Sequence, residues 1–111
     1  MLSLNEVNNK LSYFDQVEIF NIEYDNINTC YNLTLVFSKD LFDVSSQRLS
    51  ITFFYVSCLN LQDSFQSNFQ QFMSLIIEKD NNKWDNVNYD IRQIEEDNLM
   101  FKCKSFSAYL T

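Results

Sequence analysis

The stretch from Arg48 to Cys58, RLSITFFYVSC, limits the fold of this chain more than any other. It is rich in β-branched and aromatic residues, which favour an extended strand over a helix. Strand alternation divides its apolar side chains between two faces: Leu49, Ile51, Phe53 and Tyr55 on one, and Phe54, Val56 and Cys58 on the other. We therefore expect a central strand that is paired on both edges, with both faces covered in its second half.

Two helices are predicted to pack on the sheet. The first covers Ser3 to Ser12, because Ser3 and Glu6 have the spacing of a capping box and apolar residues follow at helical intervals. The second covers Ser64 to Met73, where phenylalanines recur on one helical stripe. Periodicity does not decide whether Leu75 to Glu78 extends this helix or forms a short strand.

The remaining apolar segments alternate as strands do. Gln16 to Tyr24 and Cys30 to Phe37 predict one hairpin, and Tyr89 to Ile94 and Leu99 to Leu110 predict another. Since the chain has no glycine, we expect asparagine and aspartate to form its turns. The predicted fold is a single α+β domain over residues 1–111, an antiparallel sheet of five or six strands with two short helices packed on it.

Two absent residue types exclude most catalytic chemistry. Without histidine there is no Ser-His-Asp or Cys-His catalysis and no His-based zinc or iron site. Without glycine there is no P-loop, dinucleotide-binding fingerprint or glycine nucleophile elbow. We therefore expect a protein that is not an enzyme and has no cofactor or metal.

Cysteine usage and hydropathy indicate an unexported protein. Cys30, Cys58 and Cys103 are odd in number, lack CxxC spacing and lie in apolar segments, so we expect three reduced, largely buried thiols. The longest mostly apolar run, Ile51 to Leu61, is about half of a membrane span, and Glu6 lies where a signal peptide would be basic. The expected location is cytoplasmic, with no membrane partner.

The acidic residues are unevenly distributed. Four lie between Lys10 and Lys39 with no basic residue among them, and five lie between Asp85 and Asp97 against Arg92 alone. These two clusters carry more than the whole net charge of −7. Nucleic acid is therefore a poor partner, and a basic protein is a better one. The candidate partner-binding residues are Asp15, Glu18, Glu23, Asp25, Trp84, Asp85, Asp90, Glu95, Glu96 and Asp97, with Tyr24 and Tyr89 as further aromatic anchors.

The last third of the chain carries a pattern of Tyr89-Asp90-Ile91, then Glu95, then Leu99-Met100-Phe101-Lys102-Cys103. This pattern, with the predicted architecture, resembles small bacterial immunity proteins of polymorphic-toxin and contact-dependent growth inhibition systems. The resemblance implies a single-domain cytoplasmic protein, often acidic, that binds and blocks one toxin domain, commonly a basic nuclease. Because those families share no catalytic motif, it assigns no functional residue.

Two other classes of function remain open. A small-molecule or lipid carrier would use the Phe-rich interior of a curved sheet as its pocket. A non-catalytic adaptor or subunit would pair an exposed sheet edge with another copy. The acidic character also serves solubility, whatever the function.

Overall fold

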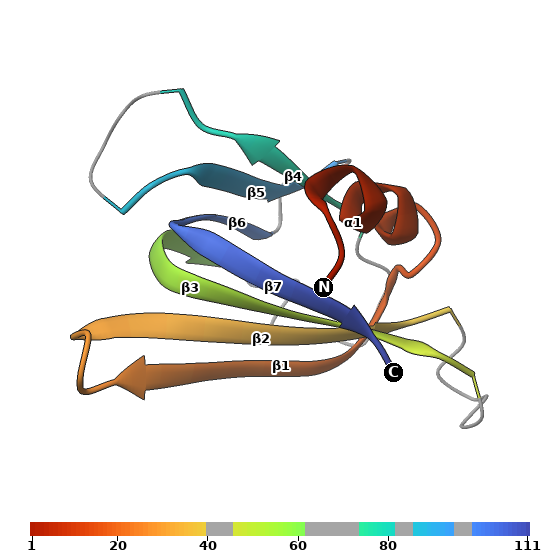
Figure 1. The fold of residues 1–111 in the computed structure, drawn as a ribbon, viewed down its shortest axis with the longest axis horizontal. Helices are drawn as coiled ribbons and strands as arrows, with labels where there is room; N and C mark the ends of the chain where they lie inside the picture. Colours follow the sequence, from red (N-terminus) through yellow and green to blue (C-terminus); the bar gives the residue numbers. More distant parts are fainter. Residues whose placement is uncertain (40–45, 62–73, 82–85, 95–98) are drawn as a thin grey trace.

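In the computed structural model, residues 1–39, 46–61, 74–81, 86–94 and 99–111 are described. They form one antiparallel sheet of seven strands and one helix (Figure 1). The elements are α1 (Leu4–Leu11), β1 (Gln16–Asp25), β2 (Cys30–Ser38), β3 (Arg48–Leu61), β4 (Leu75–Lys79), β5 (Tyr89–Gln93), β6 (Leu99–Cys103) and β7 (Ser105–Leu110). The strand order is β1-β2-β3-β6-β5-β4, and β7 also pairs with β3.

The predicted central strand is confirmed as β3. One edge of β3 pairs with β2, whereas the other pairs first with β7 and then, near its end, with β6. β6 and β7 follow one another along this edge, with Lys104 between them, so the single predicted strand from Leu99 to Leu110 is two. Leu49, Ile51 and Phe53 are fully buried, as their shared face requires.

Two irregularities bend β3, which curves strongly in Figure 1. Tyr55 has φ 58° and Cys58 has φ 53°. The pairing of β3 with β2 shifts register near Tyr55, and its pairing with β6 shifts register near Cys58, as at β-bulges. The predicted cover of both faces is wrong here, because Tyr55 and Val56 are half-buried and Cys58 is exposed.

The first predicted helix is confirmed as α1, with its capping box. The Ser3 backbone N–H donates to Glu6 Oε1 at 3.2 Å, and the Glu6 N–H donates to Ser3 Oγ at 3.3 Å. Val7 and Leu11 are fully buried in the core. The helix lies beside β4 (Figure 1), where the Asn8 side chain accepts from the Ile77 N–H at 2.9 Å and donates to the Ile77 carbonyl at 2.8 Å.

The other predicted elements have different outcomes. β1 pairs with β2 and β5 with β6, so both hairpins are confirmed. The ambiguous segment is the strand β4, which pairs with β5 and raises the number of strands above the predicted five or six. The predicted helix from Ser64 to Met73 lies outside the described residues.

Turn chemistry only partly follows the expectation for a chain without glycine. Among the described residues, four have positive φ: Thr29, Tyr55, Cys58 and Asn86. Only one of the four is an asparagine, and in the β1–β2 turn Thr29 takes the positive φ while Asp25 accepts hydrogen bonds from the turn. In this turn the aspartate, a residue type predicted to adopt positive φ, instead stabilises the turn by accepting hydrogen bonds.

One continuous apolar core joins the helix to the sheet. It includes Phe14 just before β1, Phe37 in β2, Phe53 in β3 and Phe101 in β6. No helix among the described residues has the length and apolarity to cross a membrane.

Candidate protein-binding surface

The first acidic cluster lies along β1, at one end of the strand order. Asp15 directly precedes this strand, and Glu18, Glu23 and Asp25 lie within it. Glu18 forms an ion pair with Arg48, with Oε2 2.7 Å from Nε. Glu23 is exposed and accepts a hydrogen bond from Asn21 Nδ2 at 2.9 Å. The charge of Glu18 is therefore offset by a cation on β3, and Glu23 and Asp25 place negative charge near the end of the hairpin.

Asp25 closes the β1–β2 turn with both carboxylate oxygens. Oδ1 accepts from the backbone N–H groups of Ile27 and Asn28 at 2.9 and 3.1 Å, and Oδ2 accepts from Asn28 Nδ2 at 2.8 Å. Hydrogen bonds from the side chain and backbone of Asn28 lower the pKa of this carboxyl below its usual value. Asp25 is thus a turn-stabilising residue that also adds negative charge to the tip of the hairpin.

The second acidic cluster is described only at Asp90, in β5. Trp84, Asp85, Glu95, Glu96 and Asp97 lie outside the described residues. Asp90 Oδ1 is 2.5 Å from Lys102 Nζ, and Lys102 also bonds Asp80 Oδ2 at 2.9 Å. These two hydrogen bonds raise the pKa of the Lys102 ammonium above its ordinary value. The charge of Asp90 is therefore offset by a cation on the neighbouring strand.

The described members of the two clusters do not form one surface. β1, which carries the first cluster, and β5, which carries Asp90, are separated in the sheet by β2, β3 and β6. Sequence alone could not give this separation, because it depends on which strands are neighbours.

The aromatic anchors also differ from one another. Tyr24 is 51% exposed and packs edge-on against Tyr31 in β2, with ring centroids 5.1 Å apart. Tyr89 is half-buried and packs against Phe106, also at 5.1 Å. Tyr24 is thus available to a partner, whereas Tyr89 is held largely by the core.

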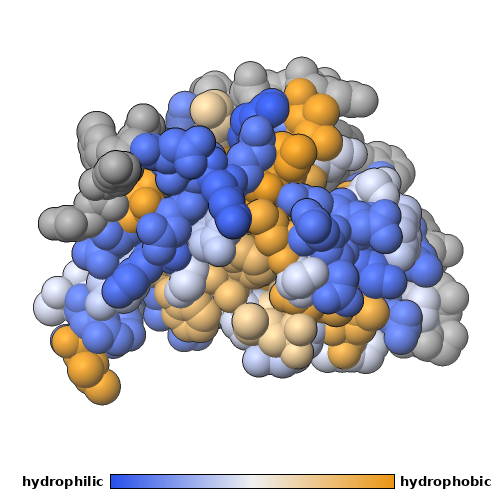
Figure 2. All heavy atoms as spheres, turned by 45° about the horizontal axis from the view of Figure 1, so that its top comes forward, coloured by the Kyte–Doolittle hydropathy of each residue, from blue (hydrophilic) through white to orange (hydrophobic). Residues whose placement is uncertain are grey.

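Apolar residues near Tyr24 were not predicted as binding residues. Ile22 is 41% exposed, Tyr31 53%, and Ile27 in the turn 92%. An apolar groove of about 300 Å³ lies where the hairpin meets the bent part of β3, lined by Ile22, Tyr31, Val56, Ser57, Cys58 and Leu59. Figure 2 shows a hydrophobic side chain projecting at the lower left, the side of the hairpin tip in Figure 1. The sequence contained a signal for this apolar surface, because apolar residues on one face of both hairpin strands continue to alternate up to the turn.

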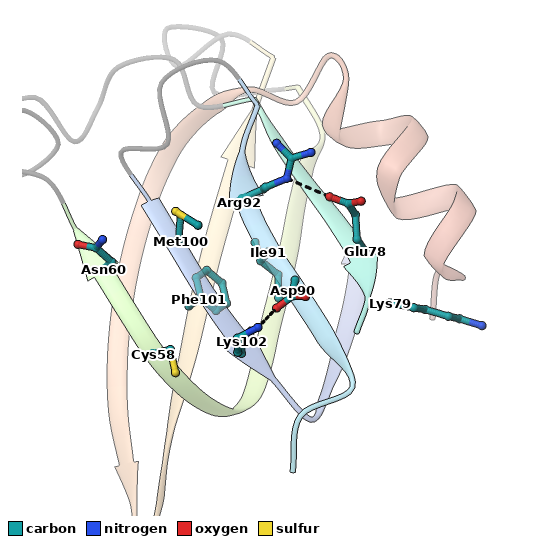
Figure 3. A pocket seen from close by; sticks show the side chains of 10 residues that line it. All are labelled: Cys58, Asn60, Glu78, Lys79, Asp90, Ile91, Arg92, Met100, Phe101 and Lys102. Atoms are coloured by element: carbon teal, nitrogen blue, oxygen red, sulfur yellow. Dashed lines mark hydrogen bonds and ion pairs between the residues drawn. The ribbon is translucent and has the colours of Figure 1, made fainter. Parts of the chain in front are cut away.

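A second groove, of about 440 Å³, lies over β3, β4, β5 and β6 (Figure 3). Its rim carries two ion pairs, Asp90 with Lys102 and Glu78 with Arg92, the latter at 3.0 Å. Phe101 contributes to its floor but packs edge-to-face on Phe53, with centroids 4.9 Å apart. Both phenylalanine side chains are buried and belong to the apolar core.

The three cysteines have three different environments. Cys103 is buried, and burial raises the pKa of its thiol to about 12, with a further contribution from the charge of Asp90. Cys30 is half-buried. Cys58 is exposed at the bulge of β3, which corrects the prediction that all three are largely buried.

Within the described ranges, no three or more cysteine, aspartate or glutamate side chains gather in a way that could hold a metal ion. Comparison of the chain with protein-family models, curated proteins and solved structures finds no match.

Proposed function

We propose that this protein is a stoichiometric inhibitor that binds a basic protein, in the manner of an immunity protein that neutralises a bacterial toxin. The observation that carries the proposal is the composition of β1. This terminal strand and its flanks carry Asp15, Glu18, Glu23 and Asp25, with no lysine or arginine from residue 11 to residue 38. Exposed Tyr24 and Ile22 lie on the same strand and add the apolar area that a protein interface needs.

A nuclease toxin fits this surface for an electrostatic reason. An enzyme that binds phosphates presents lysine and arginine, and an acidic strand can match that surface while carrying the charge of the substrate. Complementary fields also raise association rates toward about 10⁸ M⁻¹s⁻¹, and an inhibitor must act before damage accumulates.

The adaptor alternative has one observation in its favour, since β1 is the terminal strand in the order of the described strands. Pairing two copies along β1 would bring the carboxylates of Glu18 and Glu23 close to those of the second copy. Like charges directly opposite one another destabilise strand pairs. The negative charge of β1 therefore favours a basic partner over a second copy at neutral pH.

The test uses the protein encoded directly upstream of this chain. Production of that protein alone is expected to arrest growth, and co-production of this chain is expected to restore it. The purified pair should form a one-to-one complex whose association rate falls steeply with added salt. An upstream product that neither binds this chain nor arrests growth would contradict the proposal.

Three variants separate specific charge from general solubility. Asp15→Asn with Glu23→Gln removes charge from β1, and neutralising Glu95, Glu96 and Asp97 together removes it from the other cluster. Each of these two variants should slow association by about two- to tenfold. The variant whose cluster lies nearer the partner should show the larger decrease in rate. Glu78→Gln, on the opposite edge strand β4, is the control and should leave the rate unchanged. If the association rate changes neither with salt nor with any of these substitutions, the acidic surface has a role in solubility alone.

A further inference from the structure

We infer that the outer edge of β1 receives an extended segment of the basic partner as an additional strand of the sheet. The inference rests on the proposed function and specifies how the partner is held. It follows from three properties of β1: the state of its edge, the character of its two faces and its charge.

The two ends of the sheet differ in how their edges are protected. At β4, the Asn8 side chain of α1 bonds both the N–H and the carbonyl of Ile77, so the helix satisfies the backbone that another strand would use. In the half of β1 from Asn21 to Asp25, no strand or helix among the described residues pairs with the outer edge. Proteins normally blunt such an edge, because it is a template for another chain.

The far half of β1 is well formed for strand addition. β1 is ten residues long and contains no proline, and its charged side chains are all acidic, so they disfavour pairing with a second copy but not with a basic segment. Its one register shift lies between Val17 and Ile19, and from Asn21 to Asp25 the pairing with β2 is continuous. Alternate backbone groups along this half point away from β2, and no backbone group in the described part of the chain pairs with them.

The two faces of this half define the side chains of the incoming segment. Ile22 and Tyr24 lie on the face that continues the core, beside the groove lined by Tyr31 and Val56. Asn21 and Glu23 lie on the opposite face. A segment that alternates apolar residues with lysine or arginine places each kind beside its complement. A second copy of β1 would instead bring glutamate near glutamate.

The probe is a peptide of about seven residues that alternates valine and lysine, with methyl groups on the backbone nitrogens of one edge. Methylation leaves a single edge for pairing and prevents the peptide from stacking on itself. The readout is amide hydrogen exchange of the full protein. At a peptide concentration of about ten times the dissociation constant, exchange of the outward amides from Asn21 to Asp25 should slow about tenfold, because only the free fraction exchanges. The amides of β4 should be unaffected.

Two matched substitutions test the role of charge. Glu23 and Glu78 are exposed glutamates on the two outermost strands, and each change to glutamine removes one negative charge from one edge; at Glu78 it also removes the ion pair with Arg92. Glu23→Gln should weaken peptide binding by about two- to fivefold, and Glu78→Gln should not change it. A peptide of the same composition with its lysines and valines in separate blocks should give little protection of β1.

Distinct results overturn strand addition and the proposed function. Strand addition is overturned by any of three results: no peptide binding, binding without protection of the β1 amides, or protection of the β4 amides instead. The proposed function is not affected by these results, because binding of the upstream-encoded protein is measured independently. Protection of β1 amides in concentrated protein without peptide, at neutral pH, would make a second copy the occupant and would also overturn the inference.

Discussion

At the level of single residues, the bend of β3 places ordinary side chains in a conformation that glycine normally takes. Tyr55 and Cys58 both have φ near 55°, which costs a residue with a Cβ about 1–2 kcal/mol. Asn32 offsets part of this cost, because its Oδ1 accepts the Tyr55 N–H at 3.3 Å. Strict alternation predicted Cys58 beside Phe54 and Val56, and no glycine marked the positions where alternation fails. The burial of Leu49, Ile51 and Phe53 was therefore predictable, but the exposure of Cys58 was not.

This exposure leads to a prediction for thiol labelling. A neutral thiol reagent at pH 8 should modify Cys58 of native protein rapidly and Cys103 at least about a hundredfold more slowly, since Cys103 reacts only after opening of the core. Cys30, which is half-buried, should react at an intermediate rate. Mass spectrometry of quenched samples would measure the three rates. Cys58→Ser should remove the fast phase, and a fast phase that persists in this variant would contradict the observed burial.

At the level of elements, local patterns predicted those parts of the fold that local physics specifies. The Ser3–Glu6 capping box, the two hairpins and the central strand all carry their signal in neighbouring residues. β4 has no such local signal, because its apolar residues fit a helix or a strand equally well. Its pairing with β5 decides in favour of a strand. The contact of Asn8 with Ile77 was also hidden, since the two are 69 positions apart.

Asn8 is predicted to stabilise the fold by completing the edge of β4. Asn8→Ala removes two hydrogen bonds to the Ile77 backbone and should lower the free energy of unfolding by about 1–2 kcal/mol, despite the higher helix propensity of alanine. Asn9→Ala is the matched control, because Asn9 is exposed on the same helix, and it should change stability by less than about 0.5 kcal/mol. Urea unfolding measures both. Equal effects of the two substitutions would show that the contact adds nothing beyond helix propensity.

At the level of the whole molecule, sequence specifies how much charge there is but not what that charge faces. The acidic excess between residues 11 and 38 is visible in the chain, but the pairing of strands brings Arg48 to Glu18 and so balances part of it. Asp90 was counted with the second cluster on the same grounds, yet strand register places it opposite Lys102. Composition therefore identified the acidic residues of β1, and their location at one end of the sheet came only from the strand order.

The β1 turn should remain formed in mild acid. Because the pKa of Asp25 is lowered in the folded protein, its stabilising contribution is complete above the unfolded pKa of about 3.9 and is lost as pH falls through the lower folded pKa. The pKa of Glu6 in the α1 capping box is lowered too, chiefly by its hydrogen bonds with Ser3, so its contribution has the same sign. Near the sequence isoelectric point of 4.3, the molecule thus loses its net charge while the hairpin is still stabilised.

The last prediction is that the protein self-associates through β1 near pH 4.3 and is monomeric at pH 7.5. Loss of net charge removes the repulsion that keeps two copies apart, and the stretch of β1 from Asn21 to Asp25, which no other described strand than β2 pairs with, can then pair with a second copy. Ile22→Lys places a charge on that edge and should suppress the association, whereas Ile94→Lys adds the same charge at a similarly exposed isoleucine away from β1 and should not. Sedimentation velocity at both pH values measures the effect. Equal suppression by both variants would mean that net charge alone controls association and that the β1 edge has no special part in it.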